Sequence, residues 1–257
     1  MEKAYLITQN TDLNKDFSEY ERLYIWDQYC EHNMFYFLSD SDFINKILKL
    51  DKKITITTPI ISEKWIIKFF NFLDSFVKKV DIKNLELIVN EQWIFHKLSN
   101  NYTEIKIIWW NFLSWQNKDP YLKIFKDKEA HKMLSIDSKY YSNLFNSKNI
   151  ETIELYNVFQ WLTINQNFNV NMYFPYVVYS INRYCITALI NQKIDYMTVV
   201  ENCNWCKNIE KDDLDMELKI WDEKVKQYFR WNKQFYKNEE LLKYDKINRI
   251  IYNYDLI

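Results

Sequence analysis

The sequence predicts an α/β fold, a TIM-like (β/α) barrel of regular, incomplete or distorted form, in a single domain spanning residues 1–257. The length of 257 residues is ordinary for one such barrel. A hydrophobic content of 48% supplies a sizeable core. Short apolar runs rich in β-branched residues alternate with stretches of helical spacing. This alternation indicates parallel strands joined by right-handed crossovers and covered by helices.

The first half of the chain shows this alternation most clearly. Residues 54–58 are β-branched and end at Pro59, which is typical of a strand running into a loop. Ser62 then opens an apolar-periodic helix that continues to about Val80. The expected strands are 4–8, 23–25, 34–38, 54–58, 84–89 and 105–108, and the expected helices are 39–50, 62–80 and 91–99.

The second half is expected to continue the pattern and to end differently. Residues 234–237 and 249–254 are expected to form antiparallel strands at the end of the chain. The other expected strands are 150–155 and the extended apolar run 173–179, and the expected helices are 129–134, 138–146, 156–163 and 213–227. The sequence shows neither an internal repeat nor a low-complexity linker.

Charge and hydropathy exclude several classes of partner. A net charge of −1 gives no basic field for DNA. No run approaches the 18 apolar residues of a membrane span. The start of the chain lacks the apolar core of a signal peptide, so we expect a cytoplasmic protein.

The composition has one abnormal feature, which is the absence of glycine. Average usage of ~7% would give about 18 glycines in a chain of this length, whereas the sequence has none and carries ten tryptophans. Several tryptophans stand where a turn or strand end is expected, namely Trp26, Trp93, Trp109, Trp110, Trp205 and Trp231. Some uncultured bacterial lineages read the codon UGA as glycine, and a common alternative code renders it as tryptophan. We hypothesise that most or all ten tryptophans are glycine in the native protein.

The four cysteines are the strongest candidate functional residues. Cys203 and Cys206 are separated by two residues, Cys185 lies a short loop upstream, and Cys30 stands alone near the N-terminus. Cysteines in a cytosolic chain indicate metal or redox ligands before disulfides. Together the four can form a tetrahedral sulfur site. Their spacing suits an iron–sulfur cluster and structural zinc equally, and four unrelated thiols are the remaining alternative.

Other polar residues give weaker signals. His32, His96 and His131 are expected to be loop, surface or satisfied core residues, although His32 is near enough to Cys30 to replace it as a ligand. No Ser/His/Asp triad follows from the spacing. Polar residues at or after expected strand ends would face the active end of a barrel or simply contact solvent; they are Asp27, Asn90, Glu91, Asn111 and Gln116.

With glycine read at the tryptophan positions, four segments resemble one family. They are residues 23–30, 85–93, 107–120 and 179–188, the last containing Arg183-Tyr-Cys185-Ile-Thr. The chain resembles the collagenase-like peptidase U-thirty-two superfamily, and most closely the UbiU and UbiV type, over roughly residues 4 to 240. The resemblance rests on the order of these segments and on the cysteine spacing.

The resemblance implies a TIM-like barrel holding a [4Fe–4S] cluster on Cys30, Cys185, Cys203 and Cys206, with Arg183 added to the substrate face. It favours iron–sulfur over zinc. It further implies a part in an oxygen-independent hydroxylation or related modification of a small molecule or RNA, and pairing with a related chain. The chain lacks the His-Gly and Ser-Gly-x-Cys signature of the peptidase-like members. A peptidase and a zinc-stabilised scaffold are therefore the alternatives.

The recoding hypothesis makes the first prediction. Peptide mass spectrometry of the protein isolated from its native source should find glycine at the positions printed as tryptophan, because the native ribosome reads those codons as glycine. Ten indole-bearing residues at those positions would reject the hypothesis.

Overall fold

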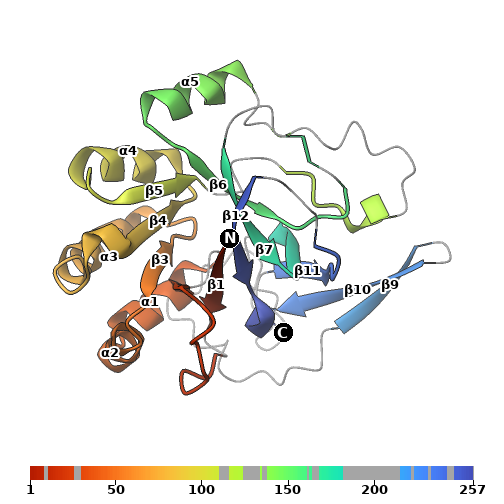
Figure 1. The fold of residues 1–257 in the computed structure, drawn as a ribbon, viewed down its shortest axis with the longest axis horizontal. Helices are drawn as coiled ribbons and strands as arrows, with labels where there is room; N and C mark the ends of the chain where they lie inside the picture. The colour runs from red at the N-terminus through yellow and green to blue at the C-terminus, as the bar shows by residue number, and fades with distance from the viewer. Residues whose placement is uncertain are drawn as a thin grey trace.

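The structure, a computed structural model, describes residues 1–8, 11–25, 30–109, 116–123, 134, 138–160, 162–163, 168–181, 215–220, 223–230, 233–241 and 246–256. Within them, eight parallel strands close into a barrel (Figure 1), which confirms the predicted TIM-like α/β fold. The barrel strands are β1 (Glu2–Ile7), β2 (Arg22–Ile25), β3 (Lys53–Thr57), β4 (Leu85–Val89), β5 (Lys106–Trp109), β6 (Thr152–Tyr156), β7 (Asn169–Phe174) and β12 (Ile247–Tyr252).

The last barrel strand, β12, closes the barrel. Strands β1 to β7 neighbour one another in chain order, and β12 lies between β7 and β1. It is parallel to both, with Glu2 opposite Arg249 and Met172 opposite Ile250. The prediction that residues 249–254 belong to an antiparallel finish is therefore wrong, because this strand pairs with the first strand of the barrel.

A second sheet accounts for the chain between β7 and β12. Its strands are β8 (Tyr176–Ile181), β9 (Asp215–Ile220), β10 (Glu223–Arg230) and β11 (Lys233–Lys237), which run antiparallel in the order β8-β11-β10-β9. Figure 1 shows β9, β10 and β11 on the side of the barrel away from the helices. The antiparallel strand expected at 234–237 is confirmed. The helix expected at 213–227 is wrong, since β9 and most of β10 occupy it. The run 173–179 divides between β7 and β8 at Pro175.

The described helices follow β2 to β5 and cover that part of the barrel (Figure 1). They are α1 (Glu31–Ser39), α2 (Ser41–Lys49), α3 (Glu63–Phe76), α4 (Gln92–Asn101) and α5 (Lys139–Ser147), with 3₁₀ turns η1 (Ile82–Asn84), η2 (Pro120–Lys123) and η6 (Tyr254–Leu256). None of these helices is both long enough and apolar enough to cross a lipid bilayer.

Two of the helix and strand predictions fail in this region. Residues 34–38, expected to be extended, lie in α1. Residues 157–160, expected to be helical, have no helix, because Asn157 bonds to neighbouring strands and loops: its N–H donates to the Tyr173 carbonyl at 3.2 Å and its side-chain amide to the Glu240 carbonyl at 2.9 Å. The helix expected at 129–134 lies outside the described residues except for Leu134.

Capping explains where α2 begins and how α2 and α5 end without glycine. The Asp40 carboxylate accepts the N–H groups of Asp42 and Phe43, each at 3.0 Å, and so starts α2. The residues directly after the C-caps of α2 and α5 are Asp51 and Asn149, with φ angles of 50° and 52°. Asp and Asn tolerate this left-handed conformation better than other residues with a Cβ.

The three tryptophans within the described residues do not take glycine-like conformations. Trp65 and Trp93 lie in α3 and α4, so the turn expected at Trp93 is wrong. Trp109 ends β5 as expected and is fully buried, with ring centroids of Phe95 and Phe145 each 5.2 Å away. The recoding hypothesis stays a prediction.

The barrel interior carries a network of buried charges at the N-terminal ends of the strands. The Arg249 guanidinium donates to the carboxylates of Glu86, at 2.6 and 3.1 Å, and of Glu2, at 2.6 Å. Arg22 pairs with the same two carboxylates at 3.4 and 3.1 Å. Burial alone would raise the pKa of Glu86, but hydrogen bonds and positive charge, mainly from Arg249, lower it to about 2. The network thus joins β1, β2, β4 and β12.

A second buried carboxyl, Glu154, lies deeper along the same interior. It accepts hydrogen bonds from the hydroxyls of Tyr173, at 2.5 Å, and Tyr24, at 2.8 Å. Tyr24 in turn accepts one from Arg249 at 2.7 Å, which connects the two carboxyls. Burial outweighs these bonds and raises the pKa of Glu154 to about 7.

Removal of the central guanidinium should strongly destabilise the barrel. We expect Arg249→Met to lower the free energy of unfolding by about 3–5 kcal/mol, because Glu2 and Glu86 lose the closer of their two shared arginine partners. Urea titration measures this. Lys3→Met is the control: Lys3 pairs with Glu19 at 3.4 Å with both side chains exposed, and a surface pair contributes about 0–1 kcal/mol. Equal effects of the two variants would contradict the assignment.

Glu154 should make the fold less stable as pH rises. An unfolded glutamate titrates near pH 4.3, so the folded state binds this proton more tightly; the stabilisation is complete below about pH 4.3 and is lost as pH rises to about 7. Between pH 5 and 8 the loss is about 2–3 kcal/mol. Glu154→Gln should remove that part of the pH dependence in urea titrations, whereas Glu151→Gln, at an exposed position just before β6, should not. Parallel pH profiles for wild type and Glu154→Gln would contradict this.

Candidate functional site

The C-terminal ends of the barrel strands bring together loops from distant parts of the sequence, as expected of this fold. Cys30 is the one predicted ligand that lies within the described residues. It follows β2 at the N-cap of α1, where its carbonyl accepts the Met34 N–H at 3.0 Å, and it is partly exposed. Cys30 therefore stands at the C-terminal mouth of the barrel.

The other three predicted cysteine ligands and three of the six predicted substrate-face residues lie outside the described residues. They are Cys185, Cys203, Cys206, Asp27, Asn111 and Arg183. In the described ranges, no group of three or more His, Cys, Asp and Glu side chains could hold a metal ion. The convergence of the four cysteines thus stays a prediction.

Asn90 reaches the mouth directly after β4. It is 2% exposed, and its side-chain amide donates to the Thr58 carbonyl after β3. Its side-chain carbonyl oxygen has no hydrogen-bond partner among the described residues. A buried acceptor left in this state is costly, and so Asn90 offers the mouth an available hydrogen-bond acceptor.

Glu91 follows as the N-cap of α4 and links three loops of the mouth. Burial and then the nearby charge of Glu31 raise its pKa, while its bonds to the Trp93 indole and the Ile61 backbone act in the opposite direction. Glu31, directly after Cys30, accepts the N–H of Ser62 at 2.7 Å and its hydroxyl at 3.1 Å. The loops after β2, β3 and β4 therefore meet beside Cys30.

On the opposite part of the mouth, Gln116 joins the loop after β5 to the end of β6. Its side chain donates to the Tyr156 carbonyl at 2.7 Å and accepts the Tyr156 N–H at 2.9 Å, as a neighbouring strand would. Gln160 holds the next residue by donating to the Asn117 carbonyl at 2.6 Å. Gln116, expected at a strand end, thus has a structural role in positioning this loop.

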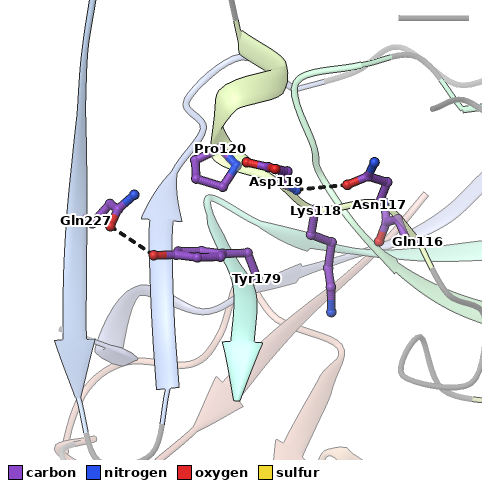
Figure 2. A pocket seen from close by; sticks show the side chains of 7 residues that line it. All are labelled: Gln116, Asn117, Lys118, Asp119, Pro120, Tyr179 and Gln227. Atoms are coloured by element: carbon purple, nitrogen blue, oxygen red, sulfur yellow. Dashed lines mark hydrogen bonds between the residues drawn. The ribbon is translucent and has the colours of Figure 1, made fainter. Parts of the chain in front are cut away.

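A cavity of about 580 Å³ opens between this loop and the second sheet. Figure 2 shows the loop on one side and Tyr179 and Gln227 on the other, with the Tyr179 hydroxyl donating to the Gln227 side-chain oxygen at 2.9 Å. The lining residues are Gln116, Asn117, Lys118, Asp119, Pro120, Tyr179 and Gln227. The cavity is large enough for a small molecule.

Lys118 is the residue of this cavity that sequence reasoning missed. Its side chain extends away from Asn117 and Asp119 (Figure 2), and its amino group lies 5.2 Å from the centre of the Tyr156 ring. Burial lowers the pKa of this lysine to about 8. One lysine among 34 basic residues carries no signal in the sequence, because its environment comes from Tyr156 and the second sheet.

Neither of the two histidines in the described residues forms a Ser/His/Asp triad at the mouth of the barrel. The His32 ring packs edge-on against Trp65 at 5.6 Å, and His96 is exposed on α4. His131 lies outside the described residues.

Comparison with known proteins adds no relative from which a function could be transferred: no protein-family model, no curated protein and no solved structure matches this chain.

Proposed function

We propose that this chain binds one [4Fe–4S] cluster through Cys30, Cys185, Cys203 and Cys206, and that it acts in or assists an oxygen-independent hydroxylation or related modification. The observation that carries the proposal is the position of Cys30 at the mouth of the barrel, between β2 and α1. An all-thiol donor set suits such a cluster.

The path of the chain supports a common location for the four thiols. Strand β8 continues from the C-terminal end of β7 and ends at Ile181, shortly before Cys185. Strand β9 begins at Asp215, shortly after Cys206. Strand β8, which precedes these three cysteines in the chain, thus starts at the same end of the barrel at which Cys30 lies.

The local environment of Cys30 suits an anionic ligand. Cys30 is the N-cap residue of a nine-residue helix, an end at which the helix dipole favours negative charge. Its partial exposure leaves the sulfur accessible. When bound, the cluster would supply electron transfer or Lewis-acid chemistry, while Asn90 and Glu91 would bind and orient a substrate at the mouth.

The proposal extends to partners and location. Pairing with a related chain and a small-molecule or RNA substrate follow from the family resemblance, and a place in the cytoplasm is part of the same proposal. The structure adds a polar mouth at which a substrate could bind.

Anaerobic purification tests the cluster. We expect a brown protein with about four iron and four sulfide per chain and a visible absorption that bleaches on reduction. Cys30→Ala should lose most of the iron because one ligand is missing. Ser39→Ala, at the exposed last residue of the helix that follows Cys30, should keep it and so controls for damage to α1.

Other outcomes separate the alternatives. A colourless protein with one zinc per chain would replace the cluster by a structural zinc site. Proteolysis that is lost on Cys→Ala but independent of iron would favour the peptidase. A folded, metal-free protein after anaerobic preparation would reject the proposal.

A further inference from the structure

The cavity between residues 116–120 and the second sheet is lined by the Lys118 side chain. In the part of the chain that the structure describes, the Lys118 amino group forms neither a hydrogen bond nor an ion pair. It lies over the Tyr156 ring, 5.2 Å from the ring centre. A lysine amine normally pairs with a carboxylate or reaches bulk solvent when it is charged. Lys118 is partly exposed, and its amine lies over the aromatic ring at the edge of the cavity.

The backbone on either side of Lys118 is held in place. Gln116 is fixed to Tyr156 by two hydrogen bonds, and Asn117 is fixed by Gln160 at its carbonyl. Pro120 opens the 3₁₀ turn that follows. A reactive side chain needs this kind of support, because a well-positioned group reacts faster than a freely moving one.

The far wall of the cavity supplies polar groups. Tyr179 and Gln227 line the cavity. Behind Tyr179, with ring centroids 5.9 Å apart, lies Tyr236, whose buried hydroxyl has no hydrogen-bond partner among the described residues. A cavity lined by amide groups, the Tyr179 hydroxyl, the Asp119 carboxylate and one amine suits a small hydroxylated ligand more than an apolar one.

We propose that Lys118 is the nucleophile of a carbonyl-binding site in this cavity and forms a Schiff base with a small hydroxylated aldehyde or ketone. The site does not involve the cysteines. It therefore stands or falls independently of the cluster.

The chemistry balances without a cofactor. The neutral Lys118 amine attacks the carbonyl carbon, and a C–N bond forms. The carbonyl oxygen then leaves as water after taking one proton from the nitrogen and one from solvent, which yields a protonated imine. The lowered pKa of Lys118, about 8, supports this step by making the neutral amine available near neutral pH.

Reductive trapping on the full-length protein tests the proposal. The protein is incubated with glyceraldehyde and sodium cyanoborohydride at pH 7.5, and the alkylated lysines are mapped by peptide mass spectrometry. At that pH a pKa of about 8 leaves roughly a quarter of the amine neutral, against about one in a thousand for an ordinary lysine. We expect Lys118 to be alkylated at least tenfold faster than Lys49, which is exposed on α2.

The comparison within one molecule needs no variant, and two variants sharpen it. Lys118→Arg should remove the fast phase of labelling, and Lys49→Arg should leave it unchanged. Equal rates at Lys118 and Lys49 in the wild-type protein would overturn the proposal. So would a fast phase that persists in Lys118→Arg.

Discussion

The closure of the barrel depends on one guanidinium. Arg249 enters on the last strand and bonds to Glu2 on the first, so the pairing of β12 with β1 carries a buried ion pair across the seam. The same group reaches Glu86 on β4 and Tyr24 on β2. Buried ions are tolerated only when paired and hydrogen-bonded, and each partner here is both. A sequence that misplaced β12 would leave Glu2 and Glu86 with Arg22 but without Arg249, and this loss disfavours other ways of closing the barrel.

The two ends of the barrel contain different kinds of polar groups. The N-terminal ends are filled by the charge network, and Glu154 with Tyr24 and Tyr173 fills the middle. The C-terminal end keeps incompletely satisfied or reactive groups: the Asn90 side-chain oxygen, the half-buried Glu91 carboxylate and the Lys118 amine. In this fold, residues at the N-terminal ends of the strands generally contribute to stability, whereas the loops at the C-terminal ends carry the catalytic residues. Cys30 lies at the C-terminal end of the barrel.

The sequence predicted the barrel because its early strands and helices show clear periodicity of their apolar residues. Individual elements were predicted wrongly where that periodicity is ambiguous. The run at 34–38 is continuously apolar, which fits a buried strand and a helix alike, and the chain makes α1. Residues 215–220 alternate polar and apolar in strand fashion, but their Glu, Leu, Met and Lys favour helix, and the sheet register prevailed. Of the site, Cys30, Asn90 and Glu91 were predictable because they follow strands. Lys118 was not, because its environment is built by tertiary contacts. The buried Trp109 indole N–H has no hydrogen-bond partner among the described residues; glycine there would remove that cost and leave a void between Phe95 and Phe145.

The central claim concerns where the iron lies. An anomalous-difference map at the iron absorption edge, from crystals of protein prepared without oxygen, measures this directly. The account predicts one strong iron peak at the C-terminal mouth, within bonding distance of the Cys30 sulfur. Iron bound elsewhere, or a peak at the mouth with the Cys30 sulfur out of bonding reach, would contradict it.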